Sequence, residues 1–172
     1  MMRNRSALLL GALFASKLAA QSCLDTNLGT DLLLGDDQLV QGLNLGFTFN
    51  FNGIGYTQIC VDSNGSIYLG GTTTAFSDYS SSEAEFLTSP NPRICGLWSD
   101  FNAAATGSGH IFFNAVPASG STPAQALVTW NGVYEYQRTT PITVQIKLDA
   151  GGIVSVHYGN QGAIGGTLTT AV

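Results

Sequence analysis

The sequence predicts an all-β protein, an antiparallel β-sandwich of about eight or nine short strands that follows a cleaved signal peptide. Two segments carry this prediction. Apolar and polar residues alternate with period two over 47–51, where three phenylalanines share a face, and over 142–149, where four aliphatic residues do so. A third observation is the 21 glycines, which with serine and asparagine interrupt every stretch that might otherwise form a helix.

The first twenty residues have the pattern of a secretory signal peptide. Arg3 and Arg5 precede an apolar run over 7–16, and Ala19-Ala20 offers a small-residue cleavage point. The run is too short to cross a bilayer, so we expect a secreted or cell-surface protein without membrane insertion once the signal is removed. An uncleaved N-terminal anchor and a lipoprotein cleavage before Cys23 are the alternatives.

The rest of the chain divides into a lead-in and a sandwich. Residues 21–46 contain loosely alternating leucine and aspartate with frequent glycine, which predicts an irregular segment with one short strand near 38–41. Residues 47–172 are expected to form the sandwich. Residues 167–172 resemble the start of a strand, so we expect the last strand to be cut short.

The strands of the sandwich are marked by apolar runs and turn signals. Asn64-Gly65 predicts a tight hairpin, and this reading is preferred to the glycosylation acceptor pattern Asn-Gly-Ser at the same place. Residues 70–93 are a polar excursion, in which Pro90 and Pro92 disfavour helix. The remaining strands are expected at 56–62, 66–69, 94–98, 111–113, 126–131, 142–149 and 154–158.

Charge excludes one class of partner. Only 10% of the residues are charged, and removal of residues 1–20 leaves three basic residues against eleven acids, a net charge of 3 − 11 = −8. Such an acidic domain has no electrostatic means of holding a phosphate backbone, so nucleic acid is excluded and anionic membrane surfaces are disfavoured.

Three cysteines in an exported protein predict one disulfide and one remaining thiol. Cys60 and Cys95 each lie inside a predicted strand, whereas Cys23 lies near the terminus. We therefore expect a Cys60–Cys95 disulfide.

The search for reactive groups yields only a weak metal site and no enzyme. The G-x-S-x-G pattern of serine hydrolases is absent, and His110 and His157 are the only histidines. Asp100 and Asn102 lie in a glycine-containing loop and, with Asp62, could supply oxygen ligands to calcium. The simpler interpretation is that Asp100 caps amides of its own loop, so no cofactor is expected.

Aromatic residues suggest a ligand-binding alternative. Trp98 and Trp130 lie inside apolar runs and are expected in the core. Tyr134 and Tyr136, which flank Glu135 in a looser stretch, are the better candidates for exposed contacts with a sugar ring or another protein.

Five segments together resemble the nidogen-type extracellular domain: DSNGSIYLGG (62–71), PRICGLWSDFNAAATGSGHIFF (92–113), ALVTWNGVYEY (126–136), ITVQIKLDAGG (142–152) and VHYGNQ (156–161). The resemblance covers roughly residues 45–172. It implies a non-catalytic module of secreted or surface proteins, of the kind found in matrix and adhesion molecules and in bacterial exported proteins. The chain departs from the family where Trp98 is followed by Ser99-Asp100 instead of two acidic residues.

These observations predict a secreted or cell-surface β-sandwich with an adhesive or structural role, which binds an extracellular protein or matrix component through its loops. A carbohydrate-binding module that uses exposed aromatic residues is the first alternative. A calcium-stabilised surface module is the second.

Overall fold

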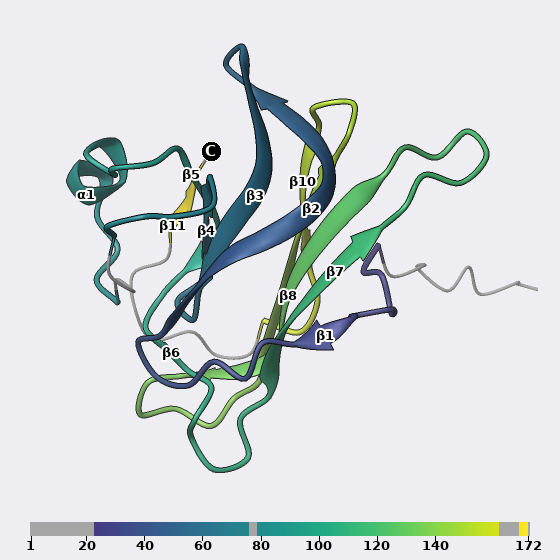
Figure 1. Cartoon of the computed structure of the whole chain (residues 1–172). Helices are drawn as coiled ribbons and strands as arrows, with labels where there is room; N and C mark the ends of the chain where they lie inside the picture. Colours follow the sequence, from purple (N-terminus) through teal and green to yellow (C-terminus); the bar gives the residue numbers. More distant parts are fainter. Residues whose placement is uncertain (1–22, 76–78, 162–168, 172) are drawn as a thin grey trace, which may run out of the picture.

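A computed structural model describes residues 23–75, 79–161 and 169–171 of the chain. The described residues form eleven β-strands and one short helix, arranged as two antiparallel sheets packed face to face (Figure 1). The predicted antiparallel β-sandwich is therefore confirmed. The predicted signal peptide, residues 1–20, lies outside the described residues.

One sheet has the strand order β11-β5-β4-β3-β2. Its strands are β2 (Leu39–Phe51), β3 (Ile54–Asp62), β4 (Ser66–Leu69), β5 (Arg93–Trp98) and β11 (Thr169–Ala171). The strand expected near 38–41 and the one at 47–51 are thus a single edge strand, β2. Its pairing with β3 shifts register twice, between Val40 and Leu43 and between Asn44 and Phe49.

The other sheet has the order β1-β7-β8-β9-β10, with β6 paired to the end of β8. Its strands are β1 (Thr30–Asp31), β6 (Phe101–Asn102), β7 (His110–Val116), β8 (Gln125–Glu135), β9 (Ile142–Asp149) and β10 (Val154–Tyr158). The two-residue strands β1 and β6 were not expected, because so short a segment has no periodicity to detect.

The core lies between the inner faces of the two sheets. The five-stranded sheet contributes residues such as Ile59 and Ile67, and the other contributes Trp130, Val144 and Ile146, all with 0% exposure. There is no room for a side chain at Gly96, where a Cβ atom would lie 2.9 Å from Ile146 Cγ1. The alternation read from the sequence thus places its apolar residues in the core.

The polar excursion contains a helix that the sequence interpretation missed. Helix α1 (Glu83–Leu87) begins after Ser82, whose Oγ accepts a hydrogen bond from the Glu85 amide at 3.2 Å and donates one to Glu85 Oε2 at 2.7 Å. The Ser-x-x-Glu pattern of a capping box is visible in the sequence, although here the Glu85 carboxylate accepts from the Ser82 hydroxyl instead of the Ser82 amide. The excursion lies outside the five-stranded sheet (Figure 1), and no helix among the described residues is long and apolar enough to span a membrane.

The structure does not contain the predicted Cys60–Cys95 disulfide, since all three cysteines are free thiols. Cys60 lies on β3 and Cys95 on β5, and β4 separates these strands. Strands two places apart are about 9.5 Å from each other, whereas a disulfide requires Cα atoms within about 7 Å. The sequence placed both cysteines in strands but gave no strand order.

Candidate functional site

The turn between β3 and β4, which we call the Ser-Asn-Gly loop (residues 63–65), lies at the centre of one end of the sandwich. Its residues are fully buried, and Gly65 has a φ of 91°. A Cβ atom at Gly65 would lie 2.0 Å from the carbonyl oxygen of Leu97, so only glycine fits here. The predicted hairpin is confirmed, with a three-residue loop instead of a two-residue turn. Burial of Asn64 also means that the folded protein offers no glycosylation acceptor there.

Asn64 connects this loop to two other segments. Its Oδ1 accepts a hydrogen bond from the Phe101 amide at 2.8 Å, and its Nδ2 donates to Asp37 Oδ1 at 2.9 Å. Phe101 begins β6, and Asp37 lies in the loop before β2. The buried Asn64 side chain therefore connects two loops, and these loops carry the acidic groups at this end of the sandwich.

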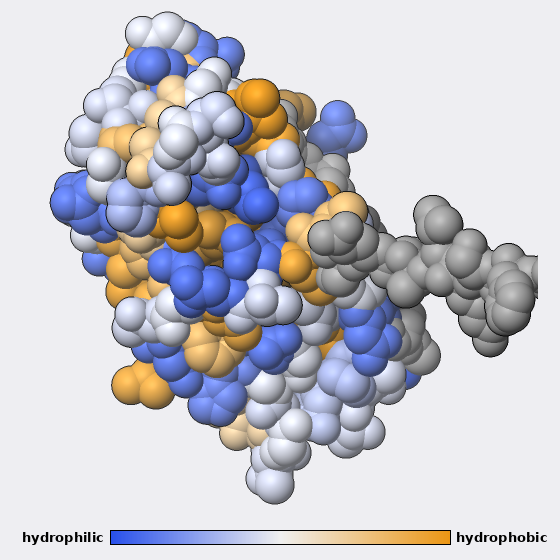
Figure 2. All heavy atoms as spheres, turned by 90° about the vertical axis from the view of Figure 1, so that its right-hand side faces the viewer, coloured by the Kyte–Doolittle hydropathy of each residue, from blue (hydrophilic) through white to orange (hydrophobic). Residues whose placement is uncertain are grey.

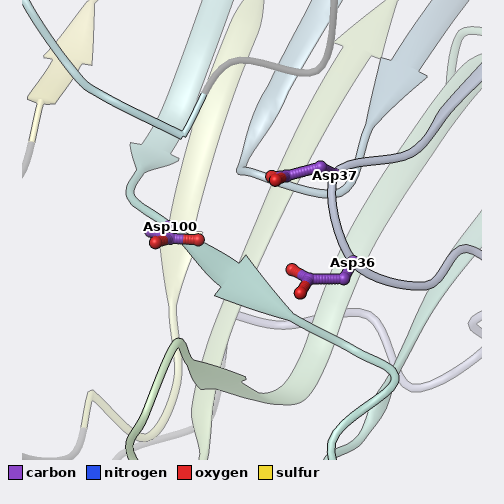
Figure 3. A group of neighbouring side chains, drawn as sticks. All are labelled: Asp36, Asp37 and Asp100. Carbon is purple, nitrogen blue, oxygen red and sulfur yellow. The ribbon is translucent and has the colours of Figure 1, made fainter.

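Those acidic groups are Asp36, Asp37 and Asp100, which each place one carboxylate oxygen within 4.8 Å of an oxygen of the other two. Figure 3 shows the three side chains converging from two loops, one before β2 and one between β5 and β6. Asp36 and Asp37 are exposed and Asp100 is half-buried. We call this group the acidic cluster.

Burial and neighbouring like charges raise the pKa of Asp100 and of Asp36. The pKa of Asp100 is raised to about 6, first by burial and then by the nearby charges of Asp37, Asp36 and Glu135. Burial and the charge of Asp37 also raise the pKa of Asp36. The folded backbone thus holds carboxylates together against their mutual repulsion.

Of the three residues predicted as calcium ligands, the structure brings only Asp100 into the acidic cluster. Asn102 is beside it, but its Nδ2 donates to Asp36 Oδ2 at 2.8 Å and its Oδ1 accepts from the Ala104 amide. Asp36 and Asp37, which the sequence interpretation missed, supply the other carboxylates. The only sequence signal for them was an adjacent acidic pair in a loop.

Asp62 lies apart from this surface, in the interior behind the Ser-Asn-Gly loop. Its Oδ1 accepts from the Asn64 and Ser66 amides at 3.0 and 2.9 Å, and its Oδ2 accepts from the Tyr68 hydroxyl at 3.1 Å. Burial raises the pKa of Asp62 to about 7, against these hydrogen bonds and the Arg93 charge. With its oxygens already bonded inside the protein, Asp62 is a structural residue and not a surface ligand.

Arg93 completes this buried polar layer on the outer side of β3–β5. Its guanidinium carbon lies 3.6 Å from the centroid of the Trp98 ring and 5.1 Å from that of Tyr68. Its Nη2 is 3.7 Å from Asp62 Oδ2. The predicted burial of Trp98 is confirmed at 0% exposure, although the ring stacks on a buried cation instead of joining the cluster between the sheets.

The candidate ligand-binding tyrosines lie at the same end of the sandwich as the acidic cluster. Strand β6 pairs with the end of β8, which places Phe101 opposite Glu135 and Asn102 opposite Tyr134. The Tyr136 amide also donates to the Asp100 carbonyl at 2.7 Å. Backbone pairing thus joins two candidate sites that are about thirty residues apart in the sequence.

The three residues of this stretch have different environments. The Tyr136 side chain is 48% exposed, whereas Tyr134 is half-buried against Gly107. Glu135 is buried at 5% exposure, and its Oε1 accepts a hydrogen bond from Ser99 Oγ at 2.8 Å. Of the three candidates, Tyr136 alone presents a large exposed ring, and Glu135 is a structural partner of the loop that carries Asp100.

The two histidines are separated by intervening strands. His110 on β7 lies 2.7 Å from Asp31 on β1, measured from Nδ1 to Oδ2. His157 is on β10, and β8 and β9 lie between the two. Burial and the neighbouring Lys147 lower the pKa of His157.

We call the surface around the acidic cluster the loop end, and it consists of Asp36, Asp37, Asp100, Asn102 and residues 134–136. Carboxylate oxygens and an exposed tyrosine ring are groups that can contact a polar or cationic partner. Three carboxylates could also contribute oxygen ligands to a cation, although acidic groups gather on surfaces without one. Calcium binding stays a prediction, which a calorimetric titration of calcium into the protein would check.

Two stacked antiparallel sheets with acidic and aromatic groups gathered in loops at one end define a β-sandwich module. The family model described as NIDO related matches residues 18–172, and the chain belongs to this family. The predicted nidogen-type resemblance is thereby confirmed, and domains of this type are typically extracellular. No curated protein and no solved structure matches the chain.

Proposed function

We propose that the protein is a secreted or cell-surface adhesive module that binds an extracellular protein or matrix component through the loop end. The observation that carries this proposal is the joining of the acidic cluster to the exposed Tyr136 by the β6–β8 pairing. A surface of this kind has an aromatic anchor beside fixed charges. Tyrosine is enriched among the residues that dominate binding energy, and fixed charges contribute specificity and faster association.

The rigidity of the loops supports the same proposal. Asn64 and Asn102 hold Asp37 and Asp36 by hydrogen bonds of 2.9 and 2.8 Å. A charged group that is already fixed loses less conformational freedom on binding than one on a mobile loop. The net charge of −8 after residue 20 adds long-range attraction for a basic partner.

The test is a pull-down with the purified mature domain against its own extracellular milieu, followed by affinity measurement with each captured component. Tyr136→Ala and the double variant Asp36→Asn/Asp37→Asn should each weaken binding at least about tenfold. Ile153→Ser is the matched control, because Ile153 is 60% exposed in the β9–β10 turn, at the other end of the sandwich from β6 (Figure 1). Binding that ignores the loop-end variants, or no binding at all, contradicts the proposal.

Carbohydrate binding is the second candidate, favoured by the exposed Tyr136 ring. A flat exposed ring beside polar oxygens can stack on the apolar face of a sugar. Screening on a glycan array distinguishes the two functions. Glycan signals that Tyr136→Ala removes would favour the second candidate, and silence on the array with retained protein binding would leave the first.

A further inference from the structure

The outer face of β8 and β9 is covered by the beginning of the described chain. Thr129, Asn131, Thr143 and Gln145 alternate with core residues of these strands and so point away from the core. Gln145 is nevertheless 0% exposed and Thr129 only 2% exposed. Residues 23–28, which we call the strap, lie across this face and shield Thr129 and Gln145 from solvent, whereas Thr143 is half-buried and Asn131 stays exposed. Figure 2 views the molecule from this side and shows polar and apolar side chains intermixed.

Gln145 recognises the strap through its backbone. Its Oε1 accepts a hydrogen bond from the Asp25 amide at 2.9 Å, and its Nε2 donates to the Asp25 carbonyl at 3.1 Å. The same Nε2 donates to Thr129 Oγ1 at 2.9 Å, which fixes the amide on the sheet. The Asp25 carboxylate turns back to the Asn27 amide instead. Because both bonds go to main-chain atoms, an extended segment of a different sequence would satisfy Gln145 equally well.

The strap does not fill the face that it covers. A hollow of about 280 Å³ lies between them, lined by Leu24, Asp25, Thr26 and Leu28 of the strap and by Thr129, Asn131 and Thr143 of the sheet. Side chains that border a hollow lack packing partners on that side. A segment attached in this way opens more readily than a strand in a complete ladder.

The chain after the strap contains a strained position. Gly29 links the strap to β1, and Leu33 follows β1 with a φ of 53° and 78% exposure. Leucine adopts left-handed backbone angles only with strain, which the closed arrangement must sustain. An opened hinge at Leu33 would release that strain, and exposed hinge loops of this kind permit exchange of a terminal segment between copies.

We propose that the outer face of β8 and β9 is a groove that binds extended peptide backbone, and that the strap of a second copy occupies it when two molecules exchange their N-terminal segments. The second copy is the occupant because it presents a segment that the groove already accommodates. In the exchanged dimer each strap makes the same contacts as in the monomer, but with the other copy. The dissociation constant of the dimer is therefore set by the effective concentration that a tethered strap has at its own groove, on the order of 1 mM. This inference goes beyond the proposed function and uses no residue of the loop end.

The first experiment tests the groove. Asp25→Pro removes the backbone N–H that donates a hydrogen bond to Gln145 Oε1, and it changes no residue of the sheet. The strap should therefore leave the face of β8 and β9 more often, which opens the groove. A peptide of residues 23–28, labelled at its Cys23 thiol, should bind Asp25→Pro at least tenfold more tightly than the wild type or Asp25→Pro/Gln145→Ala. A peptide N-methylated at the Asp25 position should bind as weakly as it does to the double variant. Equal binding to all three proteins, or none to a natively folded Asp25→Pro, overturns the proposal.

The second experiment tests the occupant with the full protein. Sedimentation equilibrium at roughly millimolar concentration should show a reversible wild-type dimer and a monomeric Asp25→Pro. A wild-type protein that stays monomeric, or a dimer that Asp25→Pro leaves unchanged, overturns the exchange between copies.

Discussion

The indole Nε1 of Trp130 donates a hydrogen bond to the carbonyl oxygen of Ser63 at 3.0 Å. Trp130 lies on β8 and Ser63 in the Ser-Asn-Gly loop, so this bond crosses the core from one sheet to the other. The same Nε1 lies 3.2 Å from the Asp62 carbonyl. The most buried turn of one sheet is thus tied to a central strand of its partner, and the acidic cluster is built on this junction through Asn64.

Gly65→Ala should destabilise the fold strongly. The substitution places a Cβ atom 2.0 Å from the Leu97 carbonyl oxygen at a φ of 91°. Backbone strain and overpacking together should lower the free energy of unfolding by at least about 3 kcal/mol. Gly46→Ala is the control, because Gly46 has a similar φ of 79° with nothing within 4 Å, and should cost about 1 kcal/mol. Urea unfolding followed by tryptophan fluorescence measures both, and equal losses would contradict the crowding at Gly65.

Asn64→Ala should cost about 2 kcal/mol of unfolding free energy. It leaves the buried Phe101 amide without its acceptor and releases Asp37 from the amide that holds it. Asn44→Ala removes a comparable hydrogen bond, to the Gly46 amide at 2.8 Å, at an exposed position and should cost under about 1 kcal/mol. If the two variants unfold at the same urea concentration, Asn64 does not have the connecting role described above.

The strands and their faces could be predicted because alternation is a local property. Phe49 and the aliphatic residues of β9 point into the core as the period of two requires. Capping chemistry was local as well, yet α1 was missed because the two prolines after it outweighed the Ser82-x-x-Glu85 pattern. The hairpin at Asn64-Gly65 was predicted correctly, but its full burial depends on Leu97 and Trp130, far away in the sequence.

The candidate site was predictable only in part, because it depends on strand order. Asp36 and Asp100 are 64 positions apart, and nothing local indicates that their carboxylates meet. The failed Cys60–Cys95 pairing has the same cause, since β4 lies between the two strands. The exposure of Tyr136 was predicted from its looser surroundings, whereas the burial of Glu135 depends on Ser99 from another segment.

One thiol in three should react in the native protein. Cys23 is exposed, whereas Cys60 and Cys95 are buried, and burial raises the pKa of Cys95 to about 11 and also raises that of Cys60. A buried, protonated thiol is a poor nucleophile. Titration with a chromogenic disulfide reagent should therefore detect one thiol per native chain and three after unfolding in denaturant. A protein that shows only one thiol after unfolding without reductant would contain the disulfide that the strand order forbids.

Asp100→Asn should stabilise the protein at pH 8 and have little effect near pH 4. The pKa of Asp100 is raised from 3.8 to about 6, so the folded state binds this proton more tightly than the unfolded state. The wild type therefore loses stability as the pH rises from about 4 to about 6, and an uncharged amide avoids that loss. The gain at pH 8 should be about 1 kcal/mol, after allowance for solvent screening at a partly exposed group. Asp62, whose pKa is also raised, titrates alike in both proteins and cancels from the difference. Glu83→Gln, at an exposed acid outside the cluster, is the control. Urea unfolding at the two pH values gives the difference, and a gain that persists unchanged at pH 4 would show that the buried and repelled charge of Asp100 is not its cause.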